Sequence, residues 1–387
     1  MKILTVLTYY RPHTSGLTIY AERLARAFAK RGQQVTVMTT QYEPSLPREE
    51  TLEGVKIVRV PVVARVSKGV LAPTFGLVAT QLVATHDVIQ MHLPQFDAPG
   101  VALRARLLRK PAVLTYHCDI QLPAGLFNRV VNSVVDFQNN MAGRLSNHIV
   151  TYTQDYADNS PYLSRYKSKL TPILPPVEMP DPLPGAIQAF AGEHRIQERR
   201  PVIGMVTRFA SEKGVEILLG ALPEILKKYP KALVLYAGQH QNVMGEQAYF
   251  DRLIPQIREY ERLGHWKFLG NLDPIDLAAV YPNLDVLTVP SLNSTEAFGL
   301  VQIEAMMNGV PSVPSALPGV RQPVLMHGMG RVARIGDSAH LAECILEVLA
   351  EPEKFRGDIG SIKTAYNPDS IAAEYEKLFE RLMMKKK

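Results

Sequence analysis

The sequence predicts an α/β protein with two doubly wound parallel-sheet domains, and three observations support this prediction. The chain has 387 residues, and at roughly 150 residues per domain this length suggests two domains. Short apolar runs alternate with segments of helical periodicity in both halves of the chain. Six prolines fall within residues 172–184, where no helix or central strand is expected to survive.

The first half begins with an apolar run at residues 2–8, which predicts a buried strand. A turn-rich loop follows, and a helix is expected at residues 17–31 because Leu24 and Phe28 lie one helical turn apart. A strand at residues 35–40 then completes a parallel-sheet unit. The same pattern predicts further strands at 55–60, 88–91, 112–115 and 148–152, with a helix at 99–108.

The second half repeats this alternation after the prolines. We expect strands at residues 202–206, 232–236, 267–268 and 286–289, and helices at 215–229, 299–308, 341–349 and 369–384. The predicted division is therefore a first domain at 1–175, a Pro-rich linker at 176–184, a second domain at 185–365 and a final helix within 366–387.

The composition excludes several classes of protein. The chain is 46% hydrophobic and 21% charged, with a mean hydropathy of −0.04, so it is neither disordered nor fibrous. Its two cysteines, Cys118 and Cys344, cannot form a disulfide framework or a cysteine-built zinc site. No apolar run reaches the roughly 20 residues that span a bilayer, and the apolar N-terminus is too short for a signal peptide. We therefore expect a cytoplasmic protein.

The formal charge of +6 is unevenly distributed. Residues 1–178 hold 20 Lys and Arg against 12 Asp and Glu, whereas residues 179–387 hold 23 against 25. The basic surplus of the first half is either ordinary solvated surface or a face that meets an anionic partner. We expect no nucleic-acid partner.

The first candidate site is the loop after the strand expected at 202–206. Arg208 offers a planar guanidinium and Lys213 a point charge, and a helix is expected to start after Gly214. Two cations beside the positive end of a helix suit a pyrophosphate. Two unrelated surface cations are the plainer interpretation.

The second candidate site follows the strand expected at 286–289, where Glu296 and Glu304 are separated by seven residues. Eight helical steps are about two turns, so both carboxylates would share an azimuth if the helix extended back to Glu296. Carboxylates accept hydrogen bonds from the vicinal hydroxyls of a ribose or hexose. Gly299 allows close approach of a ligand to the backbone. The plainer interpretation makes Glu304 one more acid on a helix surface.

Weaker candidates follow strands of the first domain. His117 and Asp119 come after the strand expected at 112–115, and His13 and Gly16 follow the first strand. A G-x-G-x-x-A match at residues 328–333 lacks a crossover helix, and a glycosylation sequon at Asn293 lies in a loop expected to be cytoplasmic. No Asp-x-Asp triplet is present, so the metal clamp of many sugar-nucleotide enzymes has no evident ligands.

At Arg208, Lys213, Glu296 and Glu304 the sequence resembles the glycogen-synthase-like family of retaining glycosyltransferases, often called family 4, over essentially the whole chain. The resemblance implies the GT-B fold, in which two Rossmann-like domains face a cleft and the last helix packs on the first domain. It implies no metal, no other cofactor and a retained anomeric configuration. Many relatives carry Gly-Gly where this chain has Ser15 and Gly16.

The resemblance also implies a role for each candidate residue. Arg208 and Lys213 would bind the donor diphosphate, and Glu304 would hold the ribose hydroxyls. Glu296 would bind the sugar, with His117 beside the transferred group. Further donor contacts would come from Gly16, Phe298, Gly299 and Leu300, while His13 and Asp119 would lie on the acceptor side.

The expected function is the transfer of a hexose, with glucose from UDP-glucose as the first choice, to a lipid-linked or small polar acceptor. A GDP-mannose-dependent mannosyltransferase, a nucleotide-sugar epimerase and a non-catalytic binder are the alternatives. The basic residues 104–110 and the apolar residues 122–135 would contact an anionic acceptor or the inner face of a membrane, although buried helix faces would explain them as well.

Overall fold

The computed structural model describes residues 1–66, 69–120 and 126–384. The chain forms two compact units. Unit 1 comprises Met1–Val177 and Ala365–Lys387, and unit 2 comprises Glu178–Thr364. The unit boundary lies in the Pro-rich segment, and the buried Val177 is tied to unit 1 because its amide donates to the carbonyl of Tyr366 at 2.9 Å.

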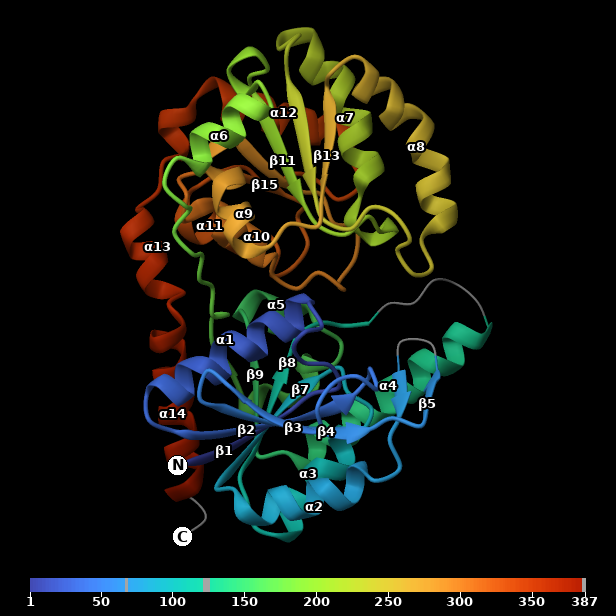
Figure 1. Ribbon diagram of the computed structural model, residues 1–387, viewed down its shortest axis with the longest axis vertical. Coiled ribbons are helices and arrows are strands. Elements are labelled where there is room, and N and C mark those ends of the chain that lie inside the picture. The colour runs from blue at the N-terminus through green and yellow to red at the C-terminus, as the bar shows by residue number, and fades with distance from the viewer. Residues whose placement is uncertain (67–68, 121–125, 385–387) are drawn as a thin grey trace. The chain divides into compact units, whose positions relative to one another are not determined.

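Unit 1 contains an eight-stranded sheet in the order β10-β9-β8-β7-β1-β2-β4-β3 (Figure 1). All neighbouring strands are parallel except β3 and β4, which form an antiparallel hairpin at one edge. The strands are β1 (Lys2–Val6), β2 (Gln34–Gln41), β3 (Glu49–Leu52), β4 (Val55–Pro61), β7 (Val88–Leu93), β8 (Ala112–Tyr116), β9 (His148–Thr151) and β10 (Leu170–Pro172), and a small separate hairpin pairs β5 (Ala64–Val66) with β6 (Gly69–Leu71).

Helices lie on both sides of this sheet, with α1 and α14 packed together and α3 packed between α2 and α4 (Figure 1). The C-terminal helix is part of unit 1 because Tyr375 bonds to Tyr20 at 2.8 Å and Glu376 forms an ion pair with Arg31 at 2.8 Å. The helices are α1 (Gly16–Lys30), α2 (Phe75–Thr85), α3 (Ala98–Leu107), α4 (Leu126–Leu145), α5 (Gln154–Asn159), η1 (Leu163–Lys169) and α14 (Pro368–Met384). Residues 385–387, at the end of the predicted final helix, lie outside the described residues.

Unit 2 contains a five-stranded parallel sheet in the order β13-β12-β11-β14-β15. Successive residues of its strands enter two different cores: Val234 and Tyr236 pack against α7, α8 and α12, whereas Leu233 and Leu235 face the opposite side. Both faces of the sheet are therefore buried, as its nearly continuous apolar strands require. The strands are β11 (Val202–Val206), β12 (Leu233–Ala237), β13 (Trp266–Gly270), β14 (Val286–Val289) and β15 (Ser312–Pro314).

The helices of unit 2 connect these strands on both faces. They are α6 (Ala186–Glu193), η2 (Ile196–Glu198), η3 (Ser211–Lys213), α7 (Val215–Lys228), α8 (Gln247–Arg262), α9 (Pro274–Val280), η4 (Tyr281–Asn283), α10 (Leu300–Met306), α11 (Gln322–His327), α12 (Ser338–Ala350), η5 (Pro352–Phe355) and α13 (Ile359–Ala365), the last of which ends at the unit boundary. Among the described residues, no helix combines the length and the apolar character needed to span a bilayer.

The predicted α/β class with doubly wound parallel sheets is confirmed. The predicted strands appear within a few residues of their observed bounds, and the final helix begins at Pro368. The sequence prediction omitted strands β3, β5, β6, β10 and β15 and helices α2, α4, α5, α6, α8, α9, α11 and α13. β3 lies at a sheet edge and β5–β6 is a small separate hairpin, and the apolar pattern of residues 69–85 divides between a strand and a helix, so no single period describes it.

Candidate active site

Two loops of unit 2 meet where the adjacent strands β11 and β14 end. The amide of Leu292 donates to the carbonyl of Glu212 at 2.9 Å, which joins the loop after β14 to the loop after β11. Gly214 has a φ of +69°, and a side chain there would overlap the carbonyl of Pro290. Only glycine therefore fits at this crossing. Ligands of open α/β sheets bind at this end of the strands.

The loop after β11 carries both predicted phosphate ligands, and each has its own carboxylate. Lys213 forms an ion pair with Glu296 at 2.6 Å, and Arg208 pairs with Glu212 four residues along the chain. These four side chains are between 13% and 38% exposed, so an anion can reach the two cations from solvent. The structure thus brings Lys213 and Glu296 together from two loops, and it gives Arg208 a partner that the sequence prediction overlooked.

Glu296 lies in the loop before α10 and closes the start of that helix. Its second oxygen accepts the amide of Gly299 at 3.0 Å. Gly299 has a φ of +77°, so helical geometry starts only at Leu300 and does not extend back to Glu296. The shared azimuth considered for Glu296 and Glu304 is therefore absent. The ring of Phe298 is buried and anchors this turn.

Glu304 lies inside α10 and is 8% exposed. Its carboxylate accepts the hydroxyl proton of Tyr281 at 2.9 Å. The helix is fixed beside it by the buried Gln302, which donates to the carbonyls of Phe298 and Val320 at 3.0 and 2.8 Å. The plainer interpretation of Glu304 as a surface acid is wrong, because a carboxylate this buried needs partners.

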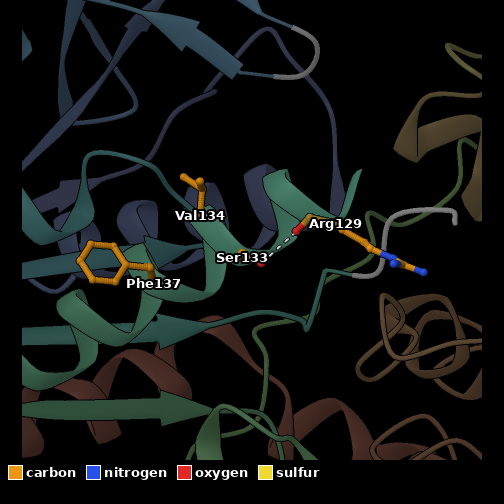
Figure 2. Close-up of a pocket in the computed structure, with 4 residues that line it drawn as sticks. All are labelled: Arg129, Ser133, Val134 and Phe137. Atoms are coloured by element: carbon orange, nitrogen blue, oxygen red, sulfur yellow. Dashed lines mark hydrogen bonds between the residues drawn. The ribbon is translucent and has the colours of Figure 1, made fainter. Parts of the chain in front are cut away.

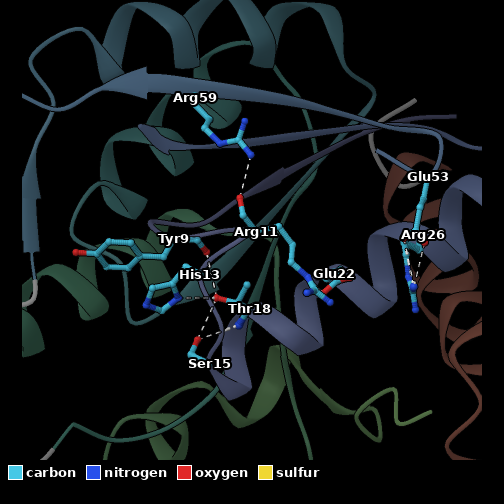
Figure 3. A network of polar contacts seen from close by, with 9 residues as sticks. All are labelled: Tyr9, Arg11, His13, Ser15, Thr18, Glu22, Arg26, Glu53 and Arg59. Atoms are coloured by element: carbon cyan, nitrogen blue, oxygen red, sulfur yellow. Dashed lines mark hydrogen bonds and ion pairs between the residues drawn. The ribbon is translucent and has the colours of Figure 1, made fainter. Parts of the chain in front are cut away.

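The loop after β1 positions the start of α1 in unit 1. Ser15 is the N-cap of α1, and its hydroxyl accepts the amide of Thr18 at 3.2 Å (Figure 3). This contact gives Ser15 a structural role at the start of the helix. A side chain at Gly16 would meet nothing within 4 Å. His13 stacks on Tyr9 with 4.8 Å between ring centroids, and burial lowers the pKa of His13.

Two arginines also hold the loop after β1. Arg59 donates to the carbonyl of Arg11 at 2.9 Å, and the Arg11 guanidinium pairs with Glu22 of α1 at 2.5 Å (Figure 3). The Arg59 side chain is only 1% exposed and also pairs with Glu50. Arg59 is therefore engaged in local structure and does not contribute to a basic surface, whereas Arg11, although paired with Glu22, is 41% exposed.

His117 follows β8 and belongs to a buried chain of polar rings. Its Nε2 lies 2.8 Å from Nδ1 of His92 at the end of β7, and its Nδ1 lies 2.5 Å from the hydroxyl of Tyr152 after β9. Burial lowers the pKa of His92 to about 3, and burial followed by the nearby His92 lowers the pKa of His117 well below 6.5. Both imidazoles are neutral at pH 7. His92 was not predicted, since the strand was expected to end at Met91.

Asp119 anchors the loop that follows His117. Its two oxygens accept hydrogen bonds from Tyr116 at 2.8 Å, Ser160 at 2.9 Å and Tyr156 at 3.0 Å. Three hydroxyl donors account for most of the acceptor capacity of one carboxylate. The structure therefore gives Asp119 a structural task in addition to its predicted place on the acceptor side.

The G-x-G-x-x-A match has a structural explanation. Gly328 ends α11, and Gly330, with a φ of +133°, lies in a bridge to Ser312 where a side chain would overlap the backbone. No group of three or more His, Cys, Asp or Glu is arranged to hold a metal ion within the part of the chain that the structure describes.

Two family models match the chain. The family described as glycosyl transferases group 1 matches residues 187–378, and the glycosyl transferase 4-like domain matches residues 15–165. The matches include all the candidate residues of the two units except His13. They therefore agree with the resemblance noted from Arg208, Lys213, Glu296 and Glu304.

Characterised relatives extend over most of the chain. A phosphatidyl-myo-inositol mannosyltransferase of Mycobacterium leprae is 26% identical over 90% of this chain and 87% of its own length. A 2-deoxystreptamine glucosyltransferase of Streptomyces kanamyceticus is 27% identical over 85% of this chain and 88% of its own. Both are glycosyltransferases, and this chain is an enzyme of that class.

Solved structures of the same architecture cover the whole chain. HepE of Anabaena in complex with UDP superposes with a TM-score of 0.76 at 20% identity, covering 98% of this chain and 100% of that one. A sucrose-phosphate synthase of Thermosynechococcus elongatus gives 0.77 at 21% identity, covering 99% of each chain. With the family models over both halves, this architecture shows that the chain belongs to the family 4 type of glycosyltransferases with the GT-B fold.

Proposed function

We propose that this enzyme transfers a hexose, with glucose from UDP-glucose as the leading candidate, to a hydroxyl group of a lipid-linked or small polar acceptor. The observation that carries the proposal is the meeting of Lys213, Glu296 and the Gly299 amide at the ends of β11 and β14. One cation, one carboxylate and one helix start within hydrogen-bonding reach of each other match a ligand with both phosphate and hydroxyl groups.

Each residue then has a distinct task. Arg208 and Lys213 hold the diphosphate, and on binding they exchange their carboxylate partners for phosphate oxygens. Glu304 accepts the ribose hydroxyls. Glu296, with the backbone of Phe298, Gly299 and Leu300, holds the sugar. Gly16 allows the start of α1 to approach the diphosphate.

The chemistry follows from the charge that develops during transfer. Cleavage of the anomeric C–O bond leaves both bonding electrons on the nucleoside diphosphate and an oxocarbenium-like sugar. Arg208 and Lys213 stabilise the departing charge in place of a metal ion. The acceptor hydroxyl attacks from the face that the phosphate leaves and gives its proton to the phosphate oxygen, so no covalent glycosyl-enzyme forms. Activity that survives EDTA supports this mechanism, and a trapped glycosyl-enzyme contradicts it.

HepE of Anabaena was crystallised with UDP and with UDP-glucose, which supports a UDP-glucose donor, whereas a starch synthase IV of Arabidopsis thaliana was crystallised with ADP and acarbose. A GDP-mannose donor is the second candidate, because phosphatidyl-myo-inositol mannosyltransferases of two mycobacterial species are among the relatives. The names of relatives also support both acceptor types: phosphatidyl-myo-inositol is a lipid, and 2-deoxystreptamine is a small polar molecule.

A thermal-shift panel of UDP, GDP, ADP and dTDP sugars tests the donor. A ligand at about 100 times its Kd stabilises the folded state by about 2.7 kcal/mol, which is a readable shift. We expect the largest shift with UDP-glucose, followed by product formation when inositol phosphates, aminocyclitols or phosphatidylinositol vesicles are added. Release of rearranged or free sugar without acceptor would favour an epimerase.

On the acceptor side, His117 would contact the transferred sugar, and His13 and Asp119 would lie nearer the acceptor. All three belong to unit 1, which also holds the basic surplus. Both ring nitrogens of His117 are bonded within unit 1, to His92 and Tyr152, so His117 would have to exchange one of these partners to contact a sugar hydroxyl.

An exposed apolar surface of unit 1 supports contact with the cytoplasmic face of a membrane. On α3 and α4, Leu107 is 73% exposed and Phe137 is 63% exposed. Figure 2 shows Arg129, Ser133, Val134 and Phe137 along α4, where they line an open groove. On these two helices and the turn after α3, the exposed side chains include Leu103, Leu107, Leu108, Val134 and Phe137, together with Arg106, Arg109 and Arg129. Apolar side chains beside arginines suit an anionic interface. Of the apolar segment 122–135 expected there, residues 122–125 lie outside the described residues.

Vesicle flotation tests this contact. Binding to phosphatidylglycerol vesicles should be strong at low salt and decrease as salt screens the arginines. Phe137→Glu and Leu107→Glu should abolish it, whereas Leu263→Glu, at a 45% exposed site in unit 2, should not. No binding to these vesicles at low salt would assign the charge of unit 1 to ordinary solvated surface, and equal binding of all variants would place the membrane contact elsewhere.

A further inference from the structure

The start of α8 holds both ends of the segment that carries Lys213. The Glu246 carboxylate accepts the amide of Ser211 at 3.0 Å, and the Tyr249 hydroxyl accepts the amide of Val215 at 3.1 Å. Ser211 and Val215 flank Lys213 by two residues on either side. Two side chains more than 30 residues away in sequence therefore fix the backbone from which this cation projects.

The Tyr249 hydroxyl is itself fixed on its other side. It donates to the carboxylate of Glu216 in the first turn of α7, and the Arg252 guanidinium lies 3.7 Å from Glu216 and 5.3 Å from the centroid of the Tyr249 ring. Burial, followed by the hydrogen bond to Glu216, raises the pKa of Tyr249. The hydroxyl stays protonated and acts as donor and acceptor at once. The ring is 8% exposed and packs on Phe209 in the same loop, with centroids 5.4 Å apart.

This arrangement changes how the loop can bind an anion. The sequence predicted that the helix after Gly214 would offer its positive end to a phosphate. In the structure, the first amide of α7, that of Val215, is occupied by Tyr249. The Val215 amide is therefore unavailable to a phosphate, which increases the part that the side chains of Arg208 and Lys213 take, and their reach depends on the backbone that α8 holds.

We propose that Tyr249 and Glu246 are positioning residues for the donor diphosphate, which set the place of Lys213 by anchoring Ser211 and Val215. The inference rests on the proposed role of Lys213 at the diphosphate. It adds α8, an element outside the motif-bearing loops, to the determinants of donor affinity. In this inference neither side chain contacts the ligand, and Lys213 meets the phosphate that UDP has and UMP lacks, so the effect of both residues is confined to that phosphate.

The test compares UDP with UMP in matched variants. Tyr249→Phe removes one hydroxyl and leaves the ring on Phe209, and Glu246→Ala removes the acceptor for Ser211. Each should raise the Kd of UDP about three- to tenfold, the range that one lost hydrogen bond gives. The Kd of UMP should change less than about twofold, and KM for UDP-glucose should rise with little change in kcat. Glu246→Gln keeps an acceptor oxygen and should behave as wild type.

Tyr260→Phe serves as the control, since Tyr260 lies near the far end of the same helix. A parallel loss of UMP and UDP affinity in Tyr249→Phe would mean general loosening of unit 2 and overturn the inference. Unchanged UDP affinity with a lower melting temperature would do the same. Different results would contradict the proposed function itself. The wild type would show no thermal shift with UDP, or Lys213→Ala would bind UDP as well as the wild type does.

Discussion

The two units present different chemistry at the carboxyl ends of their sheets. In unit 2, Arg208 and Lys213 are partly exposed, and each is paired with a carboxylate. In unit 1, His92, His117 and Tyr152 are at most 6% exposed and form a neutral hydrogen-bonded chain. One edge therefore offers charges that a ligand can exchange, and the other offers fixed dipoles.

This difference fits the proposed division of donor and acceptor between the two units. Charges that remain near solvent can meet a diphosphate without the full cost of desolvating it. Neutral groups that are held rigidly can select hydroxyl patterns, because an unmatched buried partner costs about 1–3 kcal/mol. Variants that alter one edge and leave the other intact test this difference.

The largest expected effect comes from removing the cation of unit 2. Lys213→Ala leaves Glu296 without its ion pair and removes a positive charge from the departing diphosphate, so we expect kcat/KM to fall about 100- to 1000-fold. The UDP-dependent thermal shift should be lost as well. Lys227→Ala, which removes a 72% exposed lysine paired with Glu224, is the control and should be silent. If kcat/KM of Lys213→Ala falls less than threefold, the charge of Lys213 does not stabilise the departing diphosphate. The charge difference between the two edges would then have no role in transfer.

The next effect concerns the neutral edge of unit 1 and appears in the pH dependence of stability. The pKa of His92 is about 3 in the folded chain and near 6.5 when unfolded, so the unfolded chain takes up the proton first. This contribution is complete above about pH 6.5 and is lost as the pH falls. Between pH 6.5 and 5 it amounts to about 2 kcal/mol for His92, and the lowered pKa of His117 acts in the same direction.

Urea unfolding at several pH values measures this effect. His92→Asn removes the titrating group and keeps a polar atom near the position of Nδ1, beside His117. The variant should lose about 2 kcal/mol less than wild type over the same pH interval. Identical pH profiles of wild type and His92→Asn would mean that His92 is solvated in the folded chain. The two edges would then differ less in their access to solvent than their burial indicates.

Much of the fold could be predicted because the strands are buried on both faces. The apolar runs of β11 and β14 matched their predicted bounds residue for residue, since a continuous apolar segment between turn residues has few alternatives. Edge elements such as β3 have no such pattern, with only one of four residues partly buried and the others exposed. Their pairing depends on neighbours that the local sequence does not reveal.

The site was predictable only where residue type and spacing carry the chemistry. Lys213 and Glu296 were found from motifs, but their 2.6 Å contact joins positions 83 residues apart and depends on the adjacency of β11 and β14. His92 was not predicted, because a single histidine at the end of an apolar run has no distinguishing pattern. Tyr249 was not predicted, because its role depends on the start of α8 lying beside the loop after β11.

A moderate effect is expected inside unit 2 at the ribose. Glu304→Ala removes a buried acceptor, so the Kd of UDP should rise about tenfold, the size of one hydrogen bond to a charged group. The discrimination between UDP and 2′-deoxy-UDP should disappear in this variant, because the lost contact is to a ribose hydroxyl. Tyr281→Phe removes the hydroxyl that donates to Glu304 and should preserve this discrimination. If Glu304→Ala still prefers UDP, the ribose role is wrong.

The smallest effect tests whether unit 1 approaches the donor at all. A Cβ at Gly16 meets no atom within 4 Å and Gly16 has no left-handed φ, so Gly16→Ala should fold normally or gain up to about 1 kcal/mol from its better helix propensity. If the start of α1 lies against the diphosphate, the added methyl group should still lower kcat/KM by about three- to tenfold. Gly192→Ala in α6 is the matched control, because a Cβ there also meets nothing within 4 Å. Equal activity of both variants would confine donor binding to unit 2, and the dipolar edge of unit 1 would then serve the acceptor alone.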